Sequence, residues 1–478
     1  MNSSYNSRLR IPRSVGVFVL IMLFAYFSLL IFELMGINTD YVGLGLYAIF
    51  LIYIFKHFRE MIIKYIFMFV MFTYHIGSVF AVENYPTYLY NLQTTSQWSG
   101  SFIPLVSAYV LGFCTLIVLE NNKHSKLVNR INNTEYKDGK VEISGLSNKQ
   151  LVRLLTVVLF ILMAYMLIRV RSSGYYSMGG IDRFDYRNSV FSSFDSKFYT
   201  YIAWFLPIPL LGTNLGMKKR AFAFFVVYGF YLIWIGDKFG SLFSALYFYF
   251  LVSWATKKLN RKTFRRLIIL FVAVFALLMV YIGYQVLYER GSLLEVSEYF
   301  NHRLTGGQSD LWWGVYSQEK NGVWRISEFG DELKAMFIQP NSIFDYNFGI
   351  YKMMRVTAPS WVVNNYLTKG VRFAASTQAS LFYYFKYTGL FVGSVLMFVL
   401  YFVLVNRAVY AYKRCDIVES VIYTMLISKA IYLTTMSGID MIGNITTIFG
   451  IIVLILRKYL FKSKSRIKFG IVQNEKEV

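Results

Sequence analysis

The chain is constrained most by a series of apolar runs that are each about as long as a lipid bilayer is thick. A helix needs roughly 17 to 25 apolar residues to span the hydrocarbon core, where the backbone must satisfy its own hydrogen bonds. Hydrophobic residues make up 56% of the 478 residues, more than the about 45 to 50% of ordinary soluble domains. The sequence therefore predicts an integral membrane protein made of helices.

Twelve runs qualify as candidate spans, and the second, seventh and eighth of them are short. They cover residues 14–36, 40–55, 61–82, 101–119, 151–169, 198–215, 221–236, 240–256, 267–287, 387–406, 417–437 and 443–459. We expect an all-α, polytopic bundle of about twelve transmembrane helices.

The candidate spans divide the chain into four parts. The first nine spans fall in residues 1–287, a large loop occupies 288–376, the last three spans fall in 377–460, and 461–478 form a tail. A connection as long as this loop is unusual between packed helices. Within it, DELKAMFIQP and GIYKMMRVTAP predict short amphipathic helices that lie on the membrane or cap the bundle.

Lysine and arginine gather in every second connection and produce a formal net charge of +23. Examples are 56–60, 217–220, 257–266 and 406–414. Because short basic connections stay in the cytoplasm, the alternation predicts that both termini and the tail are cytoplasmic and that the large loop lies on the outer side. Since the basic residues lie between apolar runs, we expect no nucleic-acid partner.

The segment RVRSSGYYSMGGIDRFDYR, residues 169–187, lies on the outer side by this alternation, so its arginines are exceptions to the trend. A guanidinium fork matches the oxygens of a phosphate and stays charged. Arg169 and Arg171, at the membrane edge, are candidates for binding a lipid-linked pyrophosphate, and Arg187 is a further substrate-binding candidate. The alternative is that these charges are paired with nearby aspartates such as Asp182 and Asp185.

The large loop carries basic and aromatic residues that suit a glycan. Aromatic faces pack on the apolar C–H faces of sugars while polar groups bind the hydroxyls. The candidates for substrate binding are Arg290, Arg325, Arg355, Trp312, Trp313 and Tyr316. The alternative for the tryptophans is an interfacial belt or core packing.

His302 and Arg303, in SEYFNHRLTGGQSD, are candidates for catalysis. A neutral imidazole accepts a hydroxyl proton near physiological pH, and an adjacent cation orients an anionic leaving group. Glu295 and Glu298 compete for the role of general base, and a surface histidine without a role is the alternative.

Other ionisable residues lie within the candidate spans: Glu33, His75 and Lys429. Such residues either form a site or hydrogen-bond between helices. The chain contains no HExxH, GK[ST] or GxSxG motif and no Cys/His cluster, so neither a metal nor a cofactor is expected.

The arrangement of spans and outer loops resembles the Wzy-type O-antigen polymerases. That family shows, in two outer loops, an arginine and a glycine with ten residues between them. RVRSSGYYSMGG places this spacing between Arg169 and Gly180, and RLTGGQSDLWWG places it between Arg303 and Gly314. A further similarity is Lys238 in IGDKFGSLFSAL, at the turn between the seventh and eighth spans.

The resemblance implies a GT-C-like inner-membrane glycosyltransferase that polymerises undecaprenyl-pyrophosphate-linked repeat units on the periplasmic face without a metal. The product is O-antigen or a similar surface polysaccharide. His302, Arg303 and Arg169 are then catalytic, and Lys238 joins the substrate-binding set. Membrane lipids and a polysaccharide chain-length regulator are candidate partners.

Two alternatives stay open at this point. An O-antigen ligase shares the long outer loop and a histidine–arginine pairing. A Wzx-like flippase of lipid-linked oligosaccharide also has about twelve spans, and Lys429 and His75 would suit its cavity. A flippase, however, is built from two related halves with short loops, and no internal repeat is evident in this sequence.

Overall fold

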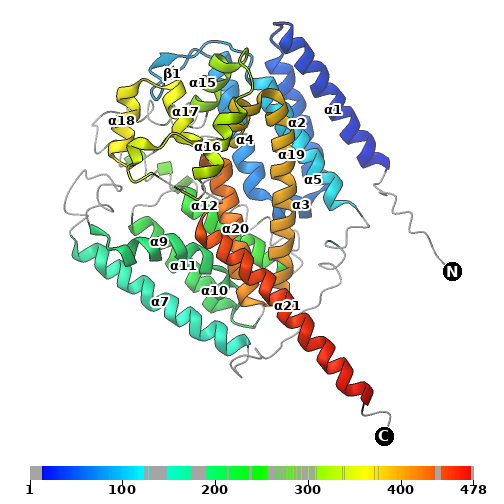
Figure 1. Cartoon of the computed structure of the whole chain (residues 1–478), viewed down its shortest axis with the longest axis vertical. Coiled ribbons are helices and arrows are strands. Elements are labelled where there is room, and N and C mark those ends of the chain that lie inside the picture. Colours follow the sequence, from blue (N-terminus) through cyan, green and yellow to red (C-terminus); the bar gives the residue numbers. More distant parts are fainter. Residues whose placement is uncertain are drawn as a thin grey trace, which may run out of the picture.

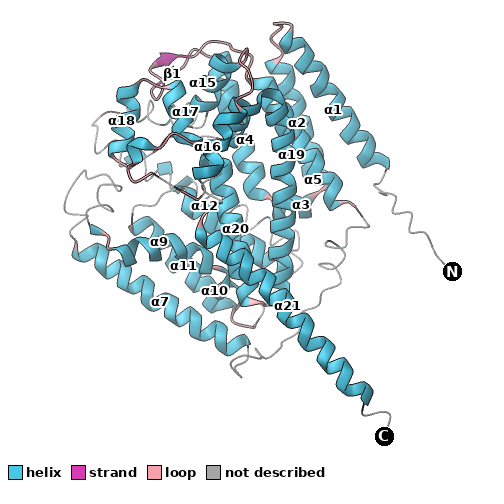
Figure 2. Cartoon of the chain, in the orientation of Figure 1, coloured by secondary structure: helices cyan, strands magenta, loops and turns pink. Residues whose placement is uncertain are grey.

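The computed structural model describes residues 13–122, 148–173, 190–212, 215–235, 239–256, 309–335, 340–370, 376–436 and 443–474, together with short pieces and isolated residues between these ranges. Within this part, the structure is helical apart from one hairpin, β1 (Tyr88–Leu89) and β2 (Thr94–Thr95) (Figure 2). The prediction of an all-α fold is confirmed for the described part of the chain.

Most of the predicted spans are single helices. They are α1 (Arg13–Leu34), α2 (Asp40–His57), α5 (Phe102–Glu120), α7 (Asn148–Ser172), α11 (Lys218–Trp234), α12 (Phe239–Thr256), α19 (Thr377–Lys413), α20 (Ile417–Met436) and α21 (Ile445–Asn474). More than half of the residues of the predicted span at 267–287 lie outside the described part of the chain.

Two predicted spans are each broken into two helices. The run at 61–82 forms α3 (Arg59–Lys64) and α4 (Ile66–Asn84), because Tyr65 leaves the helical conformation with φ −118° and ψ 22°. The run at 198–215 forms α9 (Ser193–Phe205) and α10 (Pro207–Leu211). Pro207 starts the second piece because proline has no N–H with which to continue the preceding helix.

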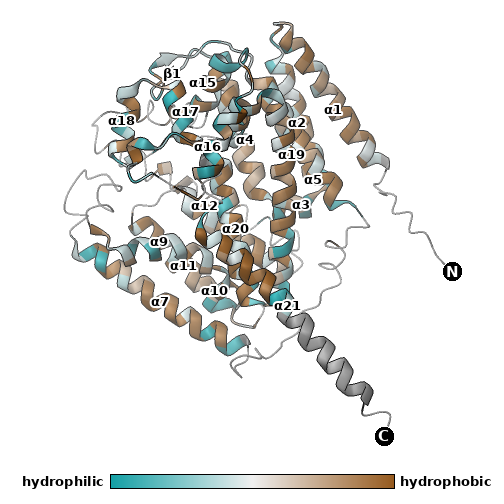
Figure 3. Ribbon diagram, viewed as in Figure 1, coloured by the Kyte–Doolittle hydropathy of each residue, from teal (hydrophilic) through white to brown (hydrophobic). Residues whose placement is uncertain are grey.

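Six of the described helices are long and apolar enough to cross a membrane. They are α1, α4, α5, α7, α19 and α20, and Figure 3 shows how strongly apolar residues dominate α1, α5 and α7. The chain therefore has the character of a multi-pass membrane protein, while the number of twelve spans stays a prediction.

Among the candidate membrane spans, α5 is the most deeply buried, and it packs against α1, α4 and α19 (Figure 1). Phe72, Phe113 and Phe398 meet there with ring centroids 4.9 to 5.9 Å apart. A Cβ atom on Gly112 would lie 2.3 Å from the ring of Phe398, so glycine is needed for this close approach of α5 and α19.

At one end, the bundle is covered by short helices that we call the cap. The cap consists of the β1–β2 hairpin, α15 (Asp310–Glu319), α16 (Ile326–Ala335), α17 (Gly349–Thr357) and α18 (Ser360–Thr368) (Figure 1). Of the two short helices predicted in the large loop, GIYKMMRVTAP is confirmed as α17, whereas DELKAMFIQP contributes only residues 331–335, which form the second half of α16.

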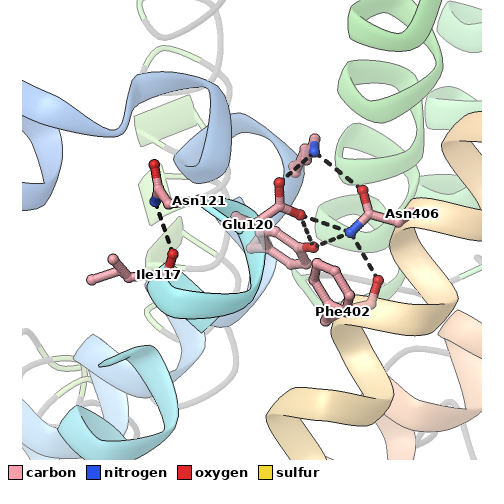
Figure 4. A network of polar contacts seen from close by, with 7 residues as sticks. Ile117, Glu120, Asn121, Phe402 and Asn406 are labelled. Carbon is pink, nitrogen blue, oxygen red and sulfur yellow. Dashed lines mark hydrogen bonds and ion pairs between the residues drawn. The ribbon is translucent and has the colours of Figure 1, made fainter. Parts of the chain in front are cut away.

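The other end, which we call the basal end, is held by a buried polar network (Figure 4). Lys64 donates from Nζ to Glu120 Oε2 at 2.7 Å and to Asn406 Oδ1 at 3.1 Å. Tyr65 donates to Glu120 Oε1 at 2.6 Å, and so does Asn406 Nδ2 at 2.7 Å. The ammonium of Lys64 also lies 5.1 Å from the centre of the Trp254 ring. The network joins α3, α5, α12 and α19. Because Lys64 follows the basic connection 56–60 closely and Asn406 begins the basic connection 406–414, both connections lie at the basal end.

We predict that Glu120→Gln lowers the free energy of unfolding by roughly 3 kcal/mol, because the buried Lys64 ammonium loses its carboxylate. Reversible denaturant unfolding of the detergent-solubilised protein measures this change. The matched control is Asp331→Asn, which breaks a 2.9 Å pair with Lys334 whose side chains are 67% and 77% exposed. The control should be indistinguishable from wild type, and an equally small effect of Glu120→Gln would contradict the role of the network.

Candidate functional site

The junction between bundle and cap is organised by the carboxylate of Glu83 in the last turn of α4. Its oxygens accept from the backbone N–H groups of Ser99, Gly100 and Ser101 at 2.6, 3.2 and 3.0 Å. They also accept from the hydroxyls of Ser99, at 2.5 Å, and Ser101. Gly100 has φ +82°, and a Cβ atom there would lie 3.1 Å from Glu33 Oε1. The carboxylate therefore fixes the 99–101 turn that leads into α5.

Helix α15 docks on this turn. The indole of Trp312 donates to the carbonyl of Ser101 at 3.1 Å, and the ammonium of Lys320 donates to the carbonyl of Ser99 at 3.3 Å. A Cβ atom on Gly314 would lie 2.9 Å from Leu92 and 3.1 Å from Thr357. Gly314, one of the two glycines of the arginine–glycine pattern, is thus required for close packing of α15.

A polar hollow of about 340 Å³ opens between the hairpin and α15. It is lined by Thr94, Thr95, Gln97, Trp98, Ser99, Trp313, Ser317 and Lys320. The last three follow one face of α15 at helical spacing, and Trp313 is fixed by an indole hydrogen bond of 3.0 Å to the carbonyl of Gln97. Trp98 is 40% exposed, so its ring is free to contact a ligand. The lining combines indole rings, hydroxyls, an amide and one ammonium, which is the chemistry that binds carbohydrate.

An ionic cluster ties the end of α15 to the rest of the cap. Glu319 binds Arg325 at 2.7 Å and Lys386 at 2.9 Å, while Glu328 binds Arg325 at 3.2 Å and Lys352 at 3.1 Å. Tyr383 also donates to Glu328 at 2.8 Å. Burial opposes the ionisation of Glu328, but these hydrogen bonds outweigh it and lower the pKa of its carboxyl.

Lys386 is the point where the cap meets the bundle. It interrupts α19 with φ 53° and ψ −141°, a conformation that costs a non-glycine residue of the order of 1 to 3 kcal/mol. Its buried ammonium is held by Glu319. A Cβ atom on Gly322 would lie 2.9 Å from that ammonium, so the turn after α15 passes directly over the pair.

The hairpin wall of the hollow is held by a second buried contact. Asn91 donates from Nδ2 to Asp310 Oδ2 at 2.9 Å and accepts from the hydroxyl of Tyr366 at 2.7 Å. Asp310 is 1% exposed, and burial raises the pKa of its carboxyl to about 7. These three side chains connect the hairpin to α15 and α18.

The predicted arginines that the structure describes have protein partners or lie exposed on a helix end. Arg169 Nε lies 3.6 Å from Asp195 Oδ2, and the side chain of Arg169 is 46% exposed. Arg171 is exposed near the end of α7. Arg325 belongs to the ionic cluster. Arg355 donates to the backbone carbonyls of Tyr346, at 3.1 Å, and Phe344, so it fastens a loop of the cap.

The predicted aromatic residues are mostly core residues. Trp312 is fully buried and Tyr316 is 3% exposed, with the Tyr316 hydroxyl 2.8 Å from that of Tyr387. These two rings offer no free face to a sugar, and for Trp312 this agrees with the packing alternative. Trp313 lines the hollow. The remaining predicted residues lie outside the described part of the chain: Arg187, Lys238, Arg290, Glu295, Glu298, His302 and Arg303.

Sequence reasoning missed most of the hollow and of the ionic cluster. Trp98, Ser317 and Lys320 line the hollow, and Glu319 and Lys386 form the centre of the cluster. Two features of the sequence could have indicated the hollow: Trp98 lies just before the predicted span at 101–119, and Lys320 follows Trp313 by two helical turns.

The ionisable residues within the spans are hydrogen-bonded. His75 Nδ1 lies 2.7 Å from the hydroxyl of Tyr109, which donates to Gln378 at 3.2 Å. Lys429 donates to three side chains at the start of α21, namely Asn444, Thr446 and Thr447. These contacts fit the interpretation that such residues join helices.

Comparisons with known proteins place part of the chain in a family context. A profile of a family of unknown function, DUF6418, matches residues 344–454, which include α17 to α20 and the start of α21. Searches of the curated proteins and of the solved structures gave no significant match.

We predict that the ionisation of Asp310 lowers the free energy of unfolding as the pH rises from about 4 to about 7. In this window the folded chain keeps a proton, because the pKa is raised from 3.8 to about 7, whereas the unfolded chain has lost it. Asp310→Asn mimics the protonated form, so the melting temperature of wild type should drop relative to that of the variant between pH 5 and 7.5.

The control for this measurement is Asp345→Asn, an exposed residue of the cap, whose melting curve should stay parallel to that of wild type across the same pH range. Parallel curves for Asp310→Asn and wild type would contradict the assignment.

Proposed function

We propose that the chain is an inner-membrane glycosyltransferase that polymerises undecaprenyl-pyrophosphate-linked oligosaccharide repeat units into O-antigen or a similar surface polysaccharide. The observation that carries this proposal is the hollow in the cap, with its tryptophans, hydroxyls and single lysine. Its volume of about 340 Å³ is at the small end of the roughly 300 to 1,000 Å³ typical of ligand sites. It therefore suits one end of an oligosaccharide.

We place the cap on the periplasmic face and the basal end in the cytoplasm. The support is the accumulation of basic connections at the basal end, as cytoplasmic connections require. In this orientation, the hollow faces the compartment where flipped repeat units are joined. The proposal keeps about twelve spans, a GT-C-like arrangement and two cytoplasmic termini.

The proposed reaction is a metal-independent substitution at the anomeric carbon of the growing chain. The hydroxyl at the non-reducing end of a new repeat unit attacks this carbon, and the bond to the pyrophosphate oxygen breaks. A general base takes the hydroxyl proton, and His302 is our candidate, with Glu295 and Glu298 as competitors. Cations stabilise the departing pyrophosphate, and we assign this role to Arg169, Arg171, Arg290 and Arg303.

The experiment supplies purified protein in vesicles with lipid-linked repeat units alone, without ATP or divalent metal. A ladder of product lengths supports polymerisation. Transfer of a finished chain to a lipid acceptor without a ladder would instead favour the ligase, and unchanged units crossing the bilayer would favour the flippase.

We predict that Lys320→Ala slows ladder growth about tenfold at low substrate concentration, since a hydrogen bond to a charged group is worth roughly 1.5 to 3 kcal/mol. Trp98→Ala should slow it several-fold by removing an exposed ring of the hollow. The matched control is Trp361→Ala, which removes a 62% exposed tryptophan from α18 outside the hollow. Equal rates in all four proteins would refute the assignment of the hollow.

We also predict that Arg169→Ala and Arg303→Ala each abolish the ladder while leaving protein in the membrane, and that lysine at either position restores little because bidentate binding is lost. Asp195→Asn tests whether Arg169 acts only by pairing with Asp195. If Asp195→Asn is as inactive as Arg169→Ala, or if both arginine variants are active, the pyrophosphate assignment is wrong.

A further inference from the structure

A second concave surface lies at the basal end, on the outer side of α2. It is a groove of about 610 Å³ lined by Ala48, Leu51, Ile52, Phe55, Lys56 and Arg59. These positions follow one face of α2 and continue into the start of α3. The groove is therefore an apolar surface that follows the helix, and two cationic side chains lie at one end of it.

The apolar part of the groove faces away from the bundle core. Ile52 is 67% exposed and Phe55 is 49% exposed, and Ala48, also exposed, leaves room between the larger side chains. In a membrane, this surface contacts acyl chains. The opposite face of α2 is buried through Tyr47, Phe50 and Ile54, so the groove is not part of the packing of the described bundle.

The charged end of the groove has no anion of its own among the described residues. Lys56 and Arg59 are both exposed, and neither makes an ion pair with a described carboxylate. Glu60 follows Arg59 directly, and adjacent helical residues do not face each other. His57 and Glu60 are the other titratable groups next to the two cations, and neither lines the groove.

We propose that this groove binds an anionic glycerophospholipid, with its phosphate at Lys56 and Arg59 and its acyl chains along Ala48 to Phe55. An exposed cation pair at the end of an apolar groove complements a phosphate that carries two hydrocarbon chains. A neutral zwitterionic lipid offers the same chains but adds a positive charge next to the phosphate. The site therefore discriminates by headgroup charge, and it is independent of the proposed glycosyltransferase activity.

The alternative to a defined site is diffuse attraction of anionic lipids to all basic residues at the basal end. The start of α11 supplies the matched control, because Lys219 and Arg220 are exposed there. Phe225 stacks on Tyr249 at 4.6 Å, so α11 runs beside α12, and Trp254 of α12 contacts Lys64 at the basal end. The double substitution Lys219→Ala/Arg220→Ala removes the same two charges at that end without touching the groove.

The test is native mass spectrometry of the purified full chain after incubation with phosphatidylglycerol or phosphatidylcholine of matched acyl chains. We expect wild type to retain phosphatidylglycerol preferentially. Lys56→Ala/Arg59→Ala should lower that retention about 25-fold. Each cation near the phosphate contributes about 1 kcal/mol, or roughly fivefold in affinity, and the two contributions multiply. Lys219→Ala/Arg220→Ala should leave it unchanged.

A third variant, Ala48→Trp, fills the groove without changing the charge and should also lower phosphatidylglycerol retention. Equal retention of the two lipids by wild type would overturn the proposal, and so would an equal loss in the α11 control. Disulfide cross-linking of Phe55→Cys between two copies of the chain would show that a second copy occupies the groove, which would also overturn it.

Discussion

The carboxylate of Glu83 is the interaction on which the rest of the cap depends. The first N–H groups of a helix have no partner within that helix, and Glu83 is only 4% exposed, so its carboxylate takes the place of water. Glu83 supplies acceptors for the 99–101 turn at the start of α5. Trp312 and Lys320 then dock on the carbonyls of this turn, so the position of α15 and the shape of the hollow follow from one buried side chain.

The two ends of the bundle use buried charge in different ways. At the basal end, Lys64 and Glu120 form a single pair that is completed by neutral partners, which holds four helices in place. In the cap, Arg325 bridges two carboxylates. The ammonium of Lys386 binds Glu319, while the backbone of Lys386 has a strained, positive φ. A strained residue persists only where its surroundings fix it, and such residues gather at functional sites. Cys415, which follows the 406–414 connection at the basal end, also has a positive φ, of 50°, so the cap is distinguished by its ionic cluster and not by a strained backbone alone.

The helices could be predicted from the sequence because a bilayer imposes a length and an apolar composition on each span. The hollow could not, because its walls are far apart in the chain: Asn91 and Asp310, which hold it, are separated by 219 positions. The aromatic residues show the same limit. Composition alone did not distinguish Trp312, which is buried, from Trp98, which is exposed, since both occur in polar stretches outside the predicted spans.

The proposed function requires that the cap binds the glycan of a lipid-linked repeat unit. Photo-crosslinking tests it most directly: a repeat unit with a photoreactive group on its glycan is bound to the purified full chain, and the labelled residues are mapped by mass spectrometry. We predict labels within 94–99 and 313–320, the two walls of the hollow. Labels confined to the basal end, around 56–64 or 406–414, would contradict it.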